Sequence, residues 1–172
     1  MQIGRLIHET LSEISGDLDR SLRDLRPLEL DWRPCDEANS IGFILWHQIR
    51  VEDAWVNEFA RGRSPVFTTD SWDVKWNIPG HHTGFGYTRE NIDAFVTPPL
   101  SSLKQYGQSV RKETITYLDG LGCEDFDLQP ETDHPWRQGY TVRRMFGHIL
   151  CELSQHVGHI RYLRGLQRGL DR

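Results

Sequence analysis

The sequence predicts an all-α protein, a four-helix bundle with a long crossover between its second and third helices. Hydrophobic residues recur at helical spacing in four long stretches, and no stretch of useful length alternates apolar and polar residues as a strand would. The long interval between the second and third stretches accounts for the crossover. We expect residues 1–172 to form a single domain, because domains of roughly 100–200 residues are common.

The first two helices are expected in the N-terminal third of the chain. The apolar stripe of the first helix is formed by Ile3, Ile7, Leu11, Ile14, Leu18 and Leu25. Pro27 and Pro34 mark the connection that follows it. The second helix is expected from Ile41 to about Ala60. Ser40 is its predicted N-cap, because a serine hydroxyl can accept a hydrogen bond from a free N–H of the first turn.

The last two helices follow the crossover. The third is expected from about Leu100 to Asp119, with Gly120 ending it. The fourth is expected from Thr141 to about Gln167. Its apolar stripe is formed by Val142, Phe146, Ile149, Leu153, Ile160 and Leu163.

The crossover loses helical periodicity between Arg61 and Tyr87, a stretch that is rich in glycine, proline and aromatic residues. Unstructured connections longer than about 12–15 residues are uncommon and are usually functional or disordered. The aromatic content argues against disorder. Two interpretations stay open, a strap that packs its aromatic side chains over the bundle and a lid over a binding site. As a lid, it is expected to line the substrate pocket with Trp72 or Trp76.

A metal site is predicted between the second and fourth helices. Glu152 and His156 are one helical turn apart, so their side chains point the same way and can hold one ion. His47 occupies the expected inner face of the second helix, and metal sites in bundles are built from facing helices. Two histidines and one carboxylate leave a position for water or substrate on zinc or another divalent ion.

The same residues also have a purely structural interpretation. A histidine in a helical core is more often hydrogen-bonded to a neighbour than bound to a metal. Glu152 could instead pair with Arg50 or Arg143. Spacing alone leaves both interpretations open.

Further candidates surround the predicted metal site. Glu52 could act as a general base or could form a salt bridge. His159, toward the solvent boundary of the fourth helix, is expected to border the substrate pocket. Cys151 points away from Glu152 on the helix, so it is expected to be a structural thiol. The crossover could bring His81 or His82 over the metal.

Two segments carry a resemblance to a known superfamily. The segment Ser40-Ile-Gly-Phe-Ile-Leu-Trp-His-Gln-Ile-Arg-Val-Glu-Asp resembles the second helix of DinB/YfiT-like proteins, which carries a metal-binding histidine. The segment Glu152-Leu-Ser-Gln-His-Val-Gly-His-Ile-Arg-Tyr-Leu-Arg resembles their last helix. The likeness extends over essentially the whole chain, including the crossover. It implies a DinB-like bundle with His47, Glu152 and His156 around zinc or nickel.

One ligand departs from the commonest pattern of this superfamily. Many members have histidine where this chain has Glu152, and the His-Glu-His set resembles the metal site of mycothiol-dependent maleylpyruvate isomerases. Those enzymes carry a further C-terminal domain, whereas this sequence ends at Arg172. We therefore expect the fold and the metal site to carry over, but not the isomerase activity.

The expected function is that of a metal-dependent enzyme acting on a small molecule. The metal would activate either water, as in a hydrolase, or a low-molecular-weight thiol, as in an S-transferase. The alternative is a stress-related protein that binds a metal or a small molecule without turnover.

Composition narrows the partners and the compartment. A net charge of -5 argues against nucleic-acid binding. Three widely spaced cysteines form no disulfide framework, and no apolar run approaches the roughly 20 residues of a membrane span. We expect a soluble cytoplasmic protein. A homodimer through the exposed sides of the first and last helices is a further expectation.

Overall fold

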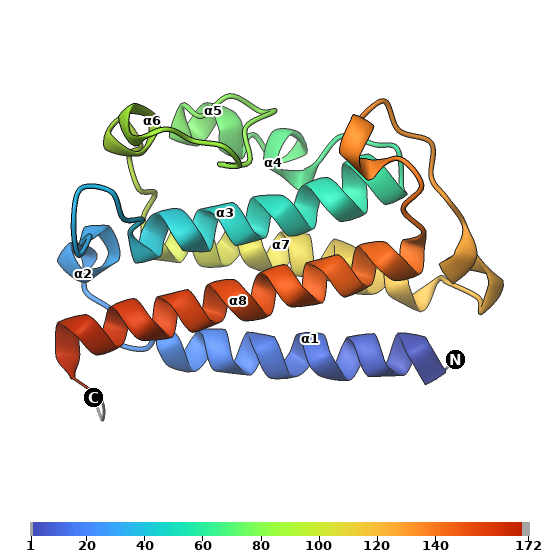
Figure 1. The fold of residues 1–172 in the computed structure, drawn as a ribbon, viewed down its shortest axis with the longest axis horizontal. Helices are drawn as coiled ribbons and strands as arrows, with labels where there is room; N and C mark the ends of the chain where they lie inside the picture. Colours follow the sequence, from blue (N-terminus) through green and yellow to red (C-terminus); the bar gives the residue numbers. More distant parts are fainter. Residues whose placement is uncertain (1, 170–172) are drawn as a thin grey trace.

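The computed structural model describes residues 2–169, and all regular secondary structure in that range is helical. Four long elements lie side by side (Figure 1). They are α1 (Gln2–Ser21), α3 (Ile41–Asp53, continued by the π-helix η1, Ala54–Ala60), α7 (Leu100–Asp119) and α8 (Val142–Arg168). The prediction of an all-α fold is confirmed.

The crossover determines the relative directions of the long helices. In Figure 1, α1 and α8 run in one direction, while α3 and α7 run in the other. The two helices α3 and α7 are parallel because the crossover returns the chain to the end of the bundle where α3 begins. Helix α3 packs against both α7 and α8, and α1 also packs against α8. This packing places the predicted ligand-bearing helices α3 and α8 next to each other.

Side-chain caps begin two of the long helices, and the sequence predicts the first of these caps, Ser40. The Ser40 hydroxyl accepts a hydrogen bond from the Phe43 backbone N–H at 3.2 Å. The Thr141 hydroxyl accepts one from the Arg144 N–H at 3.2 Å. Each cap satisfies an N–H that has no partner within its own helix.

Short helices occupy the connections. Between α1 and α3 lies α2 (Pro27–Asp31), which begins at a proline, a residue that suits the first turn of a helix. The crossover contains α4 (Val66–Thr69), α5 (Trp72–Trp76) and α6 (Arg89–Asp93), and the last connection contains the 3₁₀-helices η2 (Glu124–Asp127) and η3 (Pro135–Arg137). Helices of one turn have too few positions to show a helical period, so α4 and α5 were not predicted.

The hydrophobic core falls into two clusters along the bundle. One contains Phe43, Trp46, Phe67, Trp72 and Tyr106 among its buried residues. The other includes side chains from η1 and from the first half of α8. The crossover contributes to the first cluster, so it is packed against the bundle and does not stand away from it. No helix in residues 2–169 is long and apolar enough to span a membrane.

Self-association remains a prediction, and the exposed side chains show which surface to test. On α8, Tyr162 is 68% and Leu166 is 50% exposed, and on α1, Leu6 is 62% exposed. We expect an isologous homodimer that buries such residues. Analytical ultracentrifugation at tens of micromolar should give about twice the chain mass of 20.1 kDa. Tyr162→Glu should shift the distribution toward the monomer, and a wild-type protein that sediments only as a monomer would contradict this expectation.

Candidate metal centre

Three side chains meet where α3 faces α8. His47 comes from α3, and Glu152 and His156 come from successive turns of α8. One ligand atom from each lies within 4.8 Å of the other two. Nε2 of His156 is 3.2 Å from the Glu152 carboxylate, and the rings of His47 and His156 meet edge to face at 4.9 Å. The three residues singled out from the sequence therefore lie together.

The crossover sets the orientation of the His47 ring. Nδ1 of His47 lies 2.5 Å from the Thr83 carbonyl oxygen. Because a carbonyl oxygen can only accept, Nδ1 carries the hydrogen and donates it. This bond leaves the lone pair of Nε2 free to bind a metal, as is usual for histidine ligands. The Phe43 ring is stacked on the His47 ring, with the ring centroids 6.1 Å apart and 3° between the two planes.

Gly84 allows the crossover to come this close to α3. Its φ of +87° lies in the left-handed region, which glycine enters without strain. A Cβ atom at this position would lie 2.8 Å from the Trp46 ring and 3.1 Å from Nδ1 of His47. Any other residue would push the chain away from His47 and weaken the Thr83 hydrogen bond.

The two other candidate ligands, Glu152 and His156, lie with His148 in a line along α8. Nε2 of His148 lies 3.9 Å from Oε1 of Glu152, while Oε2 of the same carboxylate faces His156. Nδ1 of His156 is buried and has no hydrogen-bond partner within residues 2–169. A buried ring nitrogen without a partner, next to a carboxylate and a second histidine, fits a site built to hold a cation.

Burial keeps both imidazoles in the form that binds metals. Burial lowers the pKa of His47 below the usual 6.5, against the opposing effects of the Thr83 carbonyl and the Glu152 charge. Burial also lowers the pKa of His156, and the neighbouring His47 lowers it further, while Glu152 opposes both. Both rings are therefore neutral near pH 7, and neutral imidazole is the ligating form.

A small cavity adjoins two of the three residues, His47 and Glu152. Its volume is about 90 Å³. Its walls are formed by His47, Val51, Ala54, Trp55, Thr83, Phe85, Arg137, His148 and Glu152. Thr83 and Phe85 come from the crossover, which therefore borders the cavity as the lid interpretation expects.

Trp72 and Trp76 lie elsewhere, contrary to expectation. Neither is among the described residues that line the cavity. Their rings pack against each other at 5.0 Å and against Tyr106 at 6.0 and 5.7 Å. Large apolar rings gain most when fully removed from water, and the core between α5 and α7 offers that burial. The crossover thus packs some of its aromatic residues into the core, as a strap would, and borders the cavity with Phe85, while the lid over a binding site stays a prediction.

Glu52 does not reach the cavity either. Its two carboxylate oxygens accept hydrogen bonds from Arg111 at 2.7 and 2.9 Å, and the residue is 3% exposed. Five positions along a helix rotate a side chain by roughly 140°, so Glu52 points away from His47. The salt-bridge interpretation of this residue is the one that the structure supports. His159 is exposed, with its ring 5.6 Å from that of His156, and is not among the lining residues.

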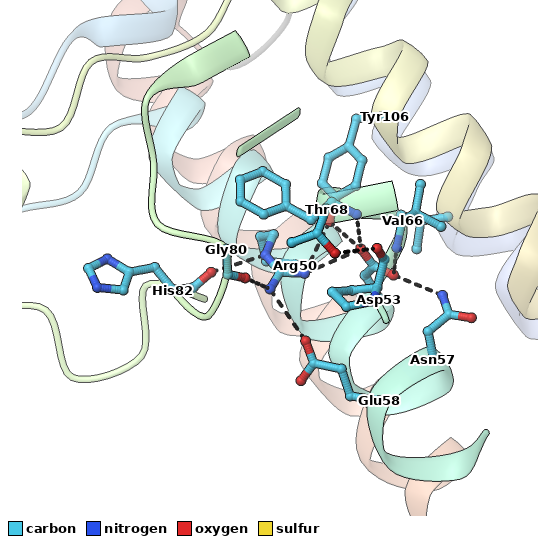
Figure 2. Close-up of polar contacts among 12 residues, drawn as sticks. Arg50, Asp53, Asn57, Glu58, Val66, Thr68, Gly80, His82 and Tyr106 are labelled. Carbon is cyan, nitrogen blue, oxygen red and sulfur yellow. Dashed lines mark hydrogen bonds and ion pairs between the residues drawn. The ribbon is translucent and has the colours of Figure 1, made fainter. Parts of the chain in front are cut away.

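A buried ion pair ties the crossover to α3, and spacing alone did not reveal it (Figure 2). The Arg50 side chain is fully buried, and its Nη1 donates a hydrogen bond to the Asp53 carboxylate at 3.2 Å. Its other nitrogens donate to the Gly80 and His82 carbonyl oxygens, both at 3.0 Å. The Arg50 interactions therefore hold the crossover directly before Thr83.

Asp53 holds the crossover at a second place, the start of α4. Its carboxylate accepts from the backbone N–H groups of Val66 and Phe67 at 2.9 Å each, and from the Tyr106 hydroxyl at 2.7 Å. Arg50 is thus occupied by Asp53, and Arg143 pairs with Asp127 at 2.6 Å, so the suggested pairing of Glu152 with either arginine is wrong. The detectable sequence signal was an arginine and an aspartate one turn apart in a largely apolar helix.

Comparisons with known proteins identify a family for this chain and a solved structure with the same fold. The family model described as mycothiol S-transferase matches residues 6–169. A crystal structure of a conserved protein from Enterococcus faecalis is 20% identical, and the match covers 99% of each chain with a TM-score of 0.85. At that identity the likeness shows the fold alone. No curated protein matches the sequence.

We expect the protein to bind one divalent ion per chain at the three converging residues. Removing one ligand should weaken zinc binding by at least the roughly 10–100-fold that loss of an outer partner costs. Zinc content of His47→Ala should therefore fall after dialysis, as measured by elemental analysis, while its circular dichroism spectrum stays helical. His81→Ala removes an exposed histidine of the crossover and serves as the matched control. Equal zinc content in the two variants would rule out His47 as a ligand.

The Arg50–Asp53 pair should contribute strongly to stability. Removing one partner of a buried pair typically costs about 3–5 kcal/mol, because the other charge stays buried alone. We expect Asp53→Ala to lower the free energy of unfolding in urea by this amount. Asp36→Ala breaks an exposed ion pair with Arg89 of the same crossover and should have little effect on stability, because exposed ion pairs contribute little. Similar losses in the two variants would show that the buried pair does not hold the crossover.

Proposed function

Because the chain belongs to the mycothiol S-transferase family, we propose that it is a metal-dependent S-transferase that joins a low-molecular-weight thiol to a small electrophilic molecule. The observation that carries the proposal is the convergence of His47, Glu152 and His156 within 4.8 Å beside a cavity. The family description supports mycothiol, or a thiol like it, as the cosubstrate. At about 90 Å³ the cavity is smaller than the roughly 300–1,000 Å³ of small-molecule sites, so it would take the reacting atoms and not a whole cosubstrate.

The proposed metal site is chemically suited to activating a thiol. Three protein ligands leave at least one coordination position open, and zinc and nickel both accept two imidazoles and a carboxylate. Two neutral rings and one carboxylate leave a divalent ion with net positive charge. Bound there, the ion supplies Lewis acidity that lowers the pKa of a thiol or of water.

The side chains around the cavity have complementary parts in this proposal. His148 lines the cavity, with Nε2 3.9 Å from Glu152, and can accept the proton that the thiol loses. The Arg137 guanidinium lies over the Trp55 ring at 4.7 Å and borders the same cavity. Its positive charge favours a thiolate or an anionic group of the substrate. The apolar walls formed by Val51, Ala54 and Phe85 limit the access of water.

Within residues 2–169, no cysteine lies at this site to act as the nucleophile instead. Cys35, Cys123 and Cys151 are free and exposed, and none of them is among the described residues that line the cavity. The sulfur that reacts is therefore proposed to come from the cosubstrate. A hydrolase would use the same residues with water in place of the thiol, so the requirement for thiol separates the two activities.

Turnover should require thiol, metal and His156. We expect conjugation of mycothiol with monochlorobimane, followed by fluorescence, to stop after treatment with a chelator and to return when zinc or nickel is added. His156→Ala should abolish turnover because one of the three ligands is lost. Cys151→Ser, a change on the same helix, should leave the rate within about twofold, since exposed substitutions rarely disturb a fold.

Each of the other outcomes would indicate a different function or mechanism for this protein. Turnover of an ester or amide without thiol would indicate a hydrolase. Tight mycothiol binding without turnover across a range of electrophiles would indicate a binding protein. Loss of turnover in Cys151→Ser with the metal retained would make that thiol the nucleophile and overturn the proposed mechanism.

A further inference from the structure

A buried arginine of α3 is connected to a candidate metal ligand on the same helix through the backbone of the crossover. Arg50 donates from Nη2 to the Gly80 carbonyl oxygen and from Nε to that of His82, both at 3.0 Å. The next residue, Thr83, accepts the Nδ1 hydrogen of His47 at 2.5 Å. These contacts fall within four consecutive residues, so the position of the Thr83 carbonyl group depends on where Arg50 holds the chain.

The contact between Thr83 and His47 decides which ring nitrogen is left for a metal. A hydrogen on Nδ1 leaves the lone pair on Nε2, whereas a ring that loses this acceptor can carry its hydrogen on either nitrogen and can turn. An imidazole that has to be ordered when the ion arrives binds it more weakly, because part of the binding free energy is used for the ordering. An anchored crossover therefore preorganises His47.

The chain that follows Thr83 is fitted just as closely to α3. A Cβ atom at Gly84 would lie 3.1 Å from Nδ1 of His47. The Tyr87 hydroxyl lies 2.6 Å from Nδ1 of His82, so the two sides of this turn are joined. At Gly86, in contrast, an added Cβ would meet no described atom within 4 Å. Closeness to the candidate ligand is therefore a property of Thr83 and Gly84, and not of every residue in the turn.

We propose that Arg50 is a positioning residue of the metal centre, which acts through the crossover backbone and Thr83 to fix the ring of His47 for metal binding. The inference rests on the metal centre of the proposed function. Coupling of two equilibria is reciprocal, so the bound metal stabilises the anchored crossover by the same factor by which anchoring tightens metal binding. Outer partners of metal ligands contribute roughly 10–100-fold to metal affinity, and we expect a factor in this range. Metal occupancy thus controls how firmly the segment beside the cavity is held.

A substitution that keeps the charge of Arg50 separates positioning from the stability of its ion pair. Arg50→Lys leaves a cation beside Asp53, but an ammonium group does not reproduce the planar fork that reaches both carbonyl oxygens. Zinc affinity, measured by competition with a chromophoric chelator, should fall roughly 10–100-fold. Arg111→Lys is the matched control, because Arg111 also pairs with a buried carboxylate, and its partners lie on α1 and α3. It should lose stability but keep the wild-type zinc affinity.

Two glycine variants test the same coupling without a change in the ion pair, and they decide the question if Arg50→Lys does not fold. Gly84→Ala pushes the chain away from His47, so zinc affinity should fall. In the metal-free variant, ¹⁵N NMR of the imidazole rings should show that His47 no longer carries its hydrogen on Nδ1 alone. Gly86→Ala imposes similar backbone strain at a φ of +72° but meets no described atom, so it should keep the affinity and the tautomer.

Hydrogen exchange of the wild-type protein measures the reciprocal effect. The backbone N–H groups of His82 and Tyr87 are hydrogen-bonded within the crossover. Saturating zinc should slow their exchange by the same factor by which Arg50→Lys weakens zinc binding. The N–H group of Leu30 in α2, in a different connection, should exchange at an unchanged rate.

The outcomes separate this inference from the metal centre on which it rests. Equal zinc affinities within either matched pair, Arg50→Lys with Arg111→Lys or Gly84→Ala with Gly86→Ala, would overturn the positioning role and leave the metal centre intact. Zinc binding that leaves the exchange of His82 unchanged would do the same. A wild-type protein that binds neither zinc nor nickel would overturn the metal centre, and this inference with it.

Discussion

The structure depends on one buried ion pair, Arg50 with Asp53. Neither side chain is exposed to solvent, so each charge must be satisfied inside the protein. Asp53 does this by binding the N–H groups at the start of α4, and Arg50 by binding the carbonyl groups at Gly80 and His82. The crossover is thereby held on α3 at two places, the start of α4 and the segment from Gly80 to His82, as Figure 2 shows. A bundle without this pair would lose these four backbone attachments of the segment that borders the candidate metal centre.

The candidate metal centre follows from this constraint. His82 is held by Arg50, so the next residue, Thr83, is placed against His47 and accepts its Nδ1 hydrogen. The ring of His47 is therefore oriented by a chain of contacts that begins one turn further along the same helix. The packing of α3 on α8 brings Glu152 and His156 next to His47. Burial lowers the pKa of both histidines and so keeps both imidazole rings neutral. Fold stability and ligand geometry rest on the same buried contacts.

Helix α3 also separates two environments. His47 points toward the crossover and α8, and the next residue, Gln48, lines a separate cavity between α1 and α7. The same division occurs on α8 between Glu152 and Leu153. Consecutive residues on a helix point about 100° apart, so a ligand-bearing helix can present different chemistry on its two sides. Glu52 belongs to the second side, and its ion pair with Arg111 forms part of that wall.

The sequence by itself determined the long helices, the Ser40 cap and the three converging residues. These features depend on local spacing, since a 3.6-residue period reveals a buried stripe and an i, i+4 pair shares one face. The expected inner face of the second helix added His47 to Glu152 and His156, and resemblance to a known superfamily supported this set. Only the tertiary structure decided the positions of Trp72, Trp76 and Glu52, and the role of Arg50. Their partners lie far away in the sequence or are backbone groups of an irregular segment, and no periodic pattern encodes such contacts.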